Sequence, residues 1–175
     1  MLIQVNVQNF KSFNESNSLN MIASNKLRTQ KDKLYESVDI ALLKSAVIYG
    51  ANASGKSNFV EVLRFMKECV INQELPIESY NWYCRNHEDN REKISSFSVQ
   101  LLLDGDCYEY GFDAILNTQT IKDEWIVNLN KKKILYQRNN EGKPLNGLNL
   151  GKEDRMRMEI YLDDFLHNDK SLFLT

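Results

Sequence analysis

The chain opens with an alternation of apolar and polar residues that predicts a β-strand over Leu2–Phe10. Leu19–Ile22 is predicted as a second strand that pairs back on the first. Further alternating segments begin at Phe97, and polar turns such as Asp104-Gly105-Asp106 separate them. Their pattern predicts an antiparallel meander, with strands at Phe97–Leu103, Cys107–Ile115, Ile121–Leu129 and Ile134–Arg138.

Two segments have a helical pattern instead. Residues 56–70 contain neither Gly nor Pro, and Glu61, Arg64 and Glu68 form a narrow polar stripe between apolar residues. This predicts a helix over Lys56–Val70 that is buried on most of its surface. Residues 151–167 are predicted as a second helix, and the apolar run Ala46–Tyr49 as a short strand.

The segment Gln73–Ser96 is predicted to be a long excursion between the first helix and the meander. It contains Pro76 and an aromatic cluster formed by Tyr80, Trp82 and Tyr83. No repeated basic spacing surrounds these rings, so we expect them to pack locally rather than to stack on nucleic-acid bases.

Composition narrows the classes of partner. The 175 residues include 22 basic and 24 acidic side chains, and the net charge of −2 provides no general attraction to nucleic acid. The basic run Lys131–Lys133 at a predicted hairpin tip is more typical of a solvated turn. No apolar run is long enough to span a membrane, no signal peptide is evident, and the three cysteines are scattered. These features predict a cytoplasmic protein without a membrane partner.

The most specific feature is Gly50–Ser57, which reads G-A-N-A-S-G-K-S and matches the phosphate-binding loop G-x-x-x-x-G-K-[ST]. The predicted strand before it and the predicted helix after it provide the context in which this motif binds phosphate. Gly50 and Gly55 let the loop curl so that its N–H groups point inward, toward phosphate at the positive end of the helix. Lys56 is suited to the β- and γ-phosphates, and the Ser57 hydroxyl to Mg²⁺. The loop therefore predicts binding of a nucleoside triphosphate with Mg²⁺.

Residues around these motifs resemble ABC-type ATPases of the SMC, RecF and OLD-nuclease group, which includes bacterial AAA-type "ATP/GTP-binding" proteins. Asn9-Phe10-Lys11-Ser12-Phe13 is similar to the opening of these proteins. Their phosphate loop is similar in Asn52 and in the trailing Asn58, although many relatives have Gly where this chain has Ala53. The segment Phe97–Arg138 is similar to the β-meander of the AAA-type subset.

The resemblance implies an α/β fold: a phosphate-loop NTPase, specifically an ABC-ATPase-like lobe with an antiparallel β-subdomain. It implies that residues 1–175 form a single, incomplete ATP-binding head lobe. The strand, loop and helix core would occupy residues 1–72, the meander residues 97–138, and a helix residues 151–167. The implied nucleotide-binding residues are Gly50, Ala51, Asn52, Ala53, Ser54, Gly55, Lys56, Ser57, Asn58, Lys11 and Ser12, with ATP and Mg²⁺ as cofactors.

The resemblance also implies partners. ATP would be sandwiched between two heads, so the full-length protein would form a homodimer. Bacterial relatives often belong to phage-defence systems, act on nucleic acid and work with a nuclease or another effector.

Catalytic residues are not assigned, because neither a signature motif nor a Walker B strand is recognisable. Ile160–Asp164 superficially resembles a Walker B strand, but the good helix formers in residues 155–159 favour a helix. Two functions therefore stay open: an ATP-driven enzyme head and a nucleotide-gated binding module that hydrolyses little or no ATP. A complete small GTPase or kinase is disfavoured, because the base-reading motif Asn-Lys-x-Asp is not found.

Overall fold

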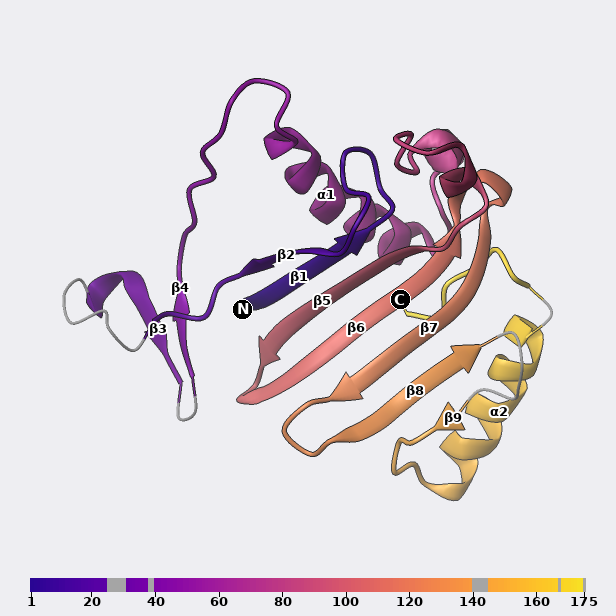
Figure 1. The fold of residues 1–175 in the computed structure, drawn as a ribbon. Helices are drawn as coiled ribbons and strands as arrows, with labels where there is room; N and C mark the ends of the chain where they lie inside the picture. Colours follow the sequence, from indigo (N-terminus) through magenta and orange to yellow (C-terminus); the bar gives the residue numbers. More distant parts are fainter. Residues whose placement is uncertain (25–30, 38–39, 140–144, 167, 175) are drawn as a thin grey trace.

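The computed structural model describes residues 1–24, 31–37, 40–139, 145–166 and 168–174. Its main body is an antiparallel sheet with the strand order β2-β1-β5-β6-β7-β8-β9 (Figure 1). The strands are β1 (Leu2–Gln8), β2 (Asn17–Asn20), β5 (Ser95–Leu103), β6 (Asp106–Ile115), β7 (Thr120–Asn128), β8 (Lys133–Asn139) and β9 (Leu145–Asn146). The first predicted strand and the four strands of the meander are confirmed to within two residues at each end. The second strand pairs back on the first as predicted, but it lies at Asn17–Asn20 rather than at Leu19–Ile22. Because β1 pairs with both β2 and β5, they all belong to one sheet.

The β5–β6 hairpin follows from its turn residues. Leu103 pairs with Asp106, so only Asp104 and Gly105 lie between the strands. Both have positive φ, 49° and 88°. This left-handed conformation matches the twist of the flanking strands and is readily adopted by Gly and tolerated by Asp.

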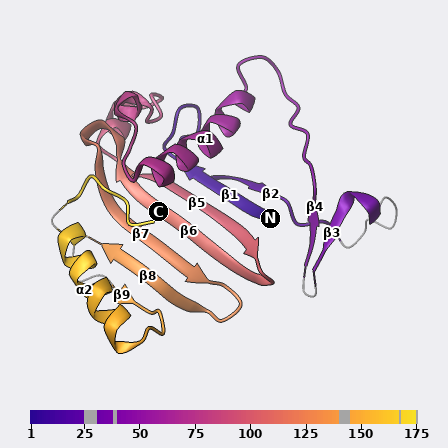
Figure 2. The same ribbon diagram turned by 180° about the vertical axis from the view of Figure 1, so that it is seen from behind.

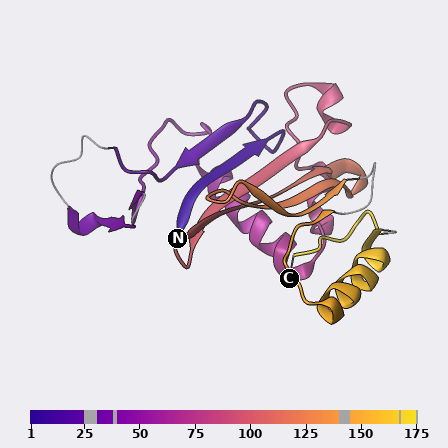
Figure 3. The same cartoon turned by 90° about the horizontal axis from the view of Figure 1, so that it is seen from below.

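Helix α1 (Lys56–Asn72) lies across one face of the sheet (Figure 2), and Figure 3 shows this layer nearly edge-on. The helix predicted over Lys56–Val70 is thus confirmed. Its buried side chains are Val62, Phe65, Met66 and Cys69. The ring centroid of Phe65 lies 4.9 Å from that of Phe97 on β5 and 5.2 Å from that of Phe10. These aromatic contacts fix the axis of α1, and with it the direction in which its N-terminus points.

The prediction that α1 is buried on most of its surface was wrong. The sheet covers one side only, and Val60 and Ile71 are 62% and 66% exposed on the remainder. A helix that contacts a single layer can bury only one stripe of its surface.

The strand predicted over Ala46–Tyr49 was also wrong. This segment runs from the small β3–β4 hairpin to α1 outside the main sheet (Figure 1), and Val47 and Tyr49 are 71% and 86% exposed. A strand needs a neighbour for its backbone N–H and C=O groups. Within the described residues, none pairs with positions 46–49. The last ladder before them joins β3 (Leu34–Glu36) to β4 (Ala41–Leu43).

Asn9, at the end of β1, forms hydrogen bonds to the long connection between α1 and β5. It has a φ of 49°, and its buried side chain accepts a hydrogen bond from Cys84 N–H at 3.0 Å. Its amide nitrogen donates to Asn90 O at 2.9 Å and to Lys93 O at 3.2 Å. The excursion contains 3₁₀ helices at Ile77–Asn81 and Glu88–Arg91. Trp82 and Tyr83 pack locally as predicted, and Trp82 contacts the rings of Phe10 and Phe65. Tyr80 is 51% exposed instead.

Helix α2 (Lys152–Leu166) confirms the second predicted helix; residue 167 lies outside the described residues. The chain then returns to the sheet face that carries α1. Leu172 is fully buried there, and its N–H donates to Gln73 O at the end of α1. Phe173 stacks on Tyr136 of β8 with 4.2 Å between ring centroids. No helix in the described ranges is long and apolar enough to cross a membrane.

Candidate functional site

The phosphate loop, Gly50–Ser57, leads directly into α1. Ala53 and Gly55 have positive φ, 65° and 90°, and α1 begins at Lys56. An ideal Cβ on Gly55 would lie 2.6 Å from Ser12 Oγ, too close for an ordinary contact. Glycine is therefore required at position 55 both by the backbone conformation and by the closeness of the Asn9–Phe13 turn.

The N-terminus of α1 has several features that favour an anion. Gly55 provides no side-chain cap, and the first turn contains no acidic residue. In the part of the chain that the structure describes, no acceptor is found for the N–H groups of Gly55, Lys56 and Ser57. Unpaired donors and the positive end of the helix dipole together favour a phosphate or carboxylate at this position.

Lys56 is held at the mouth of the loop by the loop itself. Its Nζ donates to Gly50 O at 2.8 Å and to Ala51 O at 2.6 Å. An ammonium group has three N–H donors, so one stays available for a ligand. Two loop carbonyl groups thereby orient the lysine, and no carboxylate among the residues that the structure describes forms an ion pair with it.

Lys11 and Ser12, the two residues of the Asn9–Phe13 turn that were predicted to bind nucleotide, lie in different environments. Ser12 reaches the loop: its hydroxyl accepts a hydrogen bond from Asn58 Nδ2 at 2.9 Å, and it lies against Gly55. Lys11 points along α1 instead. Its Nζ lies 3.2 Å from Glu61 Oε2 and 4.1 Å from the centre of the Trp82 ring.

These residues fit ATP and Mg²⁺ by their chemistry. The loop N–H groups and Lys56 suit phosphate oxygens, and the Ser57 hydroxyl is the type of ligand that Mg²⁺ accepts beside phosphate. Among the described residues, no group of three His, Cys, Asp or Glu side chains is arranged to hold a metal. The Walker B alternative at Ile160–Asp164 is not supported, because these residues lie within helix α2.

Sequence reasoning missed three residues beside this site. Asn9 fixes the turn that carries Ser12, and Glu61 and Trp82 hold Lys11. The resemblance pointed to the Asn9–Phe13 segment, but nothing in the sequence connects it to Glu61 or to Trp82, because those contacts join distant positions.

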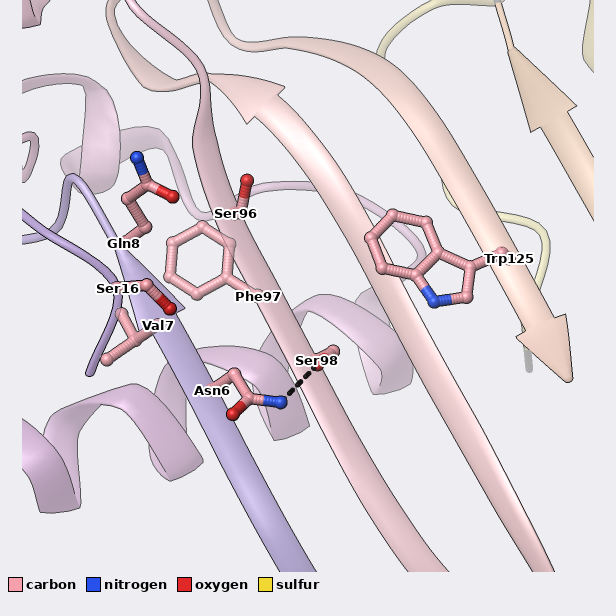
Figure 4. A pocket seen from close by; sticks show the side chains of 8 residues that line it. All are labelled: Asn6, Val7, Gln8, Ser16, Ser96, Phe97, Ser98 and Trp125. Atoms are coloured by element: carbon pink, nitrogen blue, oxygen red, sulfur yellow. Dashed lines mark hydrogen bonds between the residues drawn. The ribbon is translucent and has the colours of Figure 1, made fainter. Parts of the chain in front are cut away.

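A separate hollow of about 60 Å³ lies on the face of the sheet opposite α1 (Figure 4). Uncharged polar side chains such as Asn6 and Ser98 line it, and Asn6 Nδ2 donates to Ser98 Oγ at 2.9 Å. Trp125 lies over Gly111, where an ideal Cβ would come within 2.4 Å of the indole. The glycine is therefore explained by the packing of Trp125. This hollow is not part of the loop site.

The same outer face carries two opposed carboxylates. Asp113 on β6 pairs directly with Asp123 on β7, and each has one buried oxygen without a hydrogen-bond partner. Burial raises the pKa of both groups, and the charge of Asp123 raises the pKa of Asp113 further.

Comparison with known families agrees with this geometry. A family model described as "AAA domain, putative AbiEii toxin, Type IV TA system" matches residues 45–158, which include the whole phosphate loop, α1 and strands β5–β8. No curated protein matches the chain. Because the family model covers more than half of the sequence, the chain belongs to this AAA family of phosphate-loop, ATPase-type domains.

Proposed function

We propose that this chain is the ATP-binding lobe of an ABC/SMC-like ATPase and that Mg·ATP binds at Gly50–Ser57. The observation that carries the proposal is the uncapped N-terminus of α1, where unpaired N–H groups, Lys56 and Ser57 converge. In this proposal the loop amides and Lys56 bind the phosphates, and Ser57 binds the metal. Ser12, Lys11 and Asn58 would form the adjoining wall of the site.

The exposed apolar surface supports the further proposal that residues 1–175 are one lobe of a larger head. Val47, Ile48 and Tyr49 are exposed, as are Val60, Leu63 and Ile71 on the outer side of α1. Isolated apolar residues on a surface need no explanation, but two apolar stretches flanking the phosphate loop are typical of an interface. A second lobe would cover them, and a homodimer of complete heads would enclose ATP between two loops.

The biological role that we propose is coupling of ATP binding and hydrolysis to nucleic-acid processing or anti-phage defence, with a nuclease or another effector as partner and in the cytoplasm. The name of the matched family, which refers to a toxin of a toxin–antitoxin system, is consistent with a defence role. This part rests on resemblance rather than on the site.

A nucleotide-gated binding module is the second candidate. It is favoured by one observation: Asp163 and Asp164 lie in helix α2, not at the end of a strand beside the loop. Phosphoryl transfer needs a carboxylate to position metal or water, and the loop contributes only cations, N–H groups and a hydroxyl. Hydrolysis measured on the full-length protein separates the two candidates.

Calorimetry with Mg·ATP tests nucleotide binding. Loss of one charge-assisted contact to phosphate costs about 1.5–3 kcal/mol, so Lys56→Ala should weaken binding roughly tenfold to a hundredfold. Lys67→Ala is the matched control, because Lys67 is an exposed lysine further along α1. Equal ATP affinity for wild type and Lys56→Ala would refute the proposed site.

A further inference from the structure

Lys11 occupies a position between the phosphate loop and the middle of α1. Its neighbour Ser12 contacts Gly55 and Asn58, at the first turn of the helix. Its own ammonium lies against Glu61, three residues beyond Asn58. At 1.5 Å per residue, Glu61 lies about 5 Å from Asn58 and about 8 Å from Lys56, the first residue of the helix, along the helix axis. The flexible four-carbon stem of a lysine allows its charge to move over such a distance.

The backbone around Lys11 is fixed, so only its side chain is free to choose a partner. Lys11 has a φ of 49°, and its N–H donates to Trp82 O. Two backbone hydrogen bonds between Phe10 and Phe13 close the turn. The distance from Phe10 N to Phe13 O is 2.9 Å, and that from Phe13 N to Phe10 O is 2.8 Å. The turn thus fixes the backbone of Lys11 next to Ser12, and a change of partner requires movement of the side chain alone.

The partners that hold Lys11 are weak and replaceable. The Lys11 and Glu61 side chains are 22% and 32% exposed, so water screens their ion pair. Glu61 also lies 3.9 Å from Arg64, which stays beside it if Lys11 leaves. Departure of the lysine therefore leaves Glu61 beside Arg64, a cation that it shares with Glu68. A charge-assisted hydrogen bond to a phosphate would outcompete these contacts.

We propose that Glu61 and Trp82 bind the Lys11 side chain when no nucleotide is present, and that Lys11 moves from Glu61 to the terminal phosphate of a bound nucleoside triphosphate. Glu61 is then a positioning residue that sets the discrimination between triphosphate and diphosphate. This inference rests on the proposed function, because it requires nucleotide at the phosphate loop.

Calorimetry on the full chain with Mg·ATP and Mg·ADP tests the proposal in Glu61→Gln. The substitution removes the competing charge, so the preference for ATP over ADP should rise by roughly 1.5- to fivefold, the range expected for a screened ion pair. Glu68→Gln is the matched control, since Glu68 pairs with Arg64 at 2.9 Å on the same helix and does not contact Lys11. In Lys11→Gln, adding Glu61→Gln should leave the preference unchanged. Because each preference is a ratio within one variant, a general loss of stability does not affect it.

Trp82 provides a second readout that does not depend on turnover. Only Trp82 and Trp125 are tryptophans, so Trp125→Phe leaves Trp82 as the single indole reporter. Addition of the slowly hydrolysed analogue ATPγS should change Trp82 emission as the ammonium leaves the ring, whereas ADP should not, and Lys11→Gln should abolish the difference.

The outcomes separate the two hypotheses. If wild type and Lys56→Ala bind ATP equally, the proposed function fails and this inference fails with it. If binding depends on Lys56 but Glu61→Gln leaves the preference between ATP and ADP unchanged, only this inference is overturned. Lys11 and Glu61 then act as a structural contact between the turn and α1.

Discussion

Glu124 and Arg138 face each other across β7 and β8, both almost fully buried, with 3.7 Å between Oε2 and Nη2. Together they hold the chain that follows α2. Phe173 N–H donates to Glu124 Oε2 at 2.9 Å, and Arg138 donates to Ser171 O at 2.6 Å. Glu124 also accepts a hydrogen bond from Tyr110 OH at 3.1 Å. Through these contacts with backbone groups, the pair fastens residues 168–174 to the sheet.

Glu124→Gln should destabilise the fold strongly. It leaves the buried guanidinium of Arg138 without its counter-charge, which costs about 2–4 kcal/mol, near the lower end of what loss of a buried ionic partner costs because Gln keeps one acceptor oxygen. The melting temperature should fall by on the order of 10 °C. Differential scanning calorimetry measures the shift. Lys131→Gln, which breaks the exposed pair with Asp106, is the control and should change little. Similar melting temperatures for Glu124→Gln and wild type would show that the pair of Glu124 and Arg138 does not stabilise the fold.

Ala53→Gly should relieve conformational strain in the phosphate loop. A left-handed φ of 65° is costly for alanine, by about 1–2 kcal/mol, whereas glycine adopts it freely and loses about 0.5–1 kcal/mol of that gain to chain entropy. We expect the free energy of unfolding to rise by roughly 0.5–1 kcal/mol in urea unfolding, since the loop has this conformation in the folded protein without a ligand. Ala51→Gly, at a position without positive φ, should show no gain. A lower free energy of unfolding in Ala53→Gly would indicate that the methyl group of Ala53 contributes to packing.

Asp113→Asn should stabilise the protein at neutral pH. Burial raises the folded-state pKa of Asp113 above its ordinary value of 3.8, so ionisation weakens the fold as pH rises through the folded pKa. The gain should appear above that folded pKa and disappear below pH 3.8, where the aspartate is protonated in both states. Like charges opposed across two strands cost roughly 0.5 kcal/mol. Urea unfolding at several pH values measures the difference, with Glu92→Gln as an exposed control. A gain that is the same at every pH would rule out this cause.

The chain alone should release no phosphate from Mg·ATP above background. Asp163 and Asp164 lie within α2, so no carboxylate at the end of a strand adjoins the loop among the described residues. A steady-state phosphate-release assay should give the same baseline for wild type, Lys56→Ala and Asp163→Asn. Turnover that is lost in both variants would instead assign Asp163 to the catalytic metal and water.

The sequence predicted those parts of the fold that depend on local patterns. Alternation located β1 and the meander, and the glycines with Lys56 located the phosphate loop. It failed at Ala46–Tyr49 because an apolar run shows strand propensity but not whether a neighbouring strand exists. The roles of Asn9 and Glu124 were not predictable for a related reason. Both residues bind backbone groups of distant segments. Because nearly every residue has the same backbone groups, the sequence does not indicate which of them a side chain will bind.

The pairing of β1 with β5 determines when this domain can fold. Val5 pairs with Val99, and Phe65 of α1 packs on Phe97. During synthesis, β1 and α1 therefore leave the ribosome well before the strand that joins them is made. Contacts this distant in sequence slow folding, and the apolar side of α1 stays open to other proteins in the meantime. We therefore expect this domain to fold only after β5 has left the ribosome, and to depend on chaperones when it is produced rapidly.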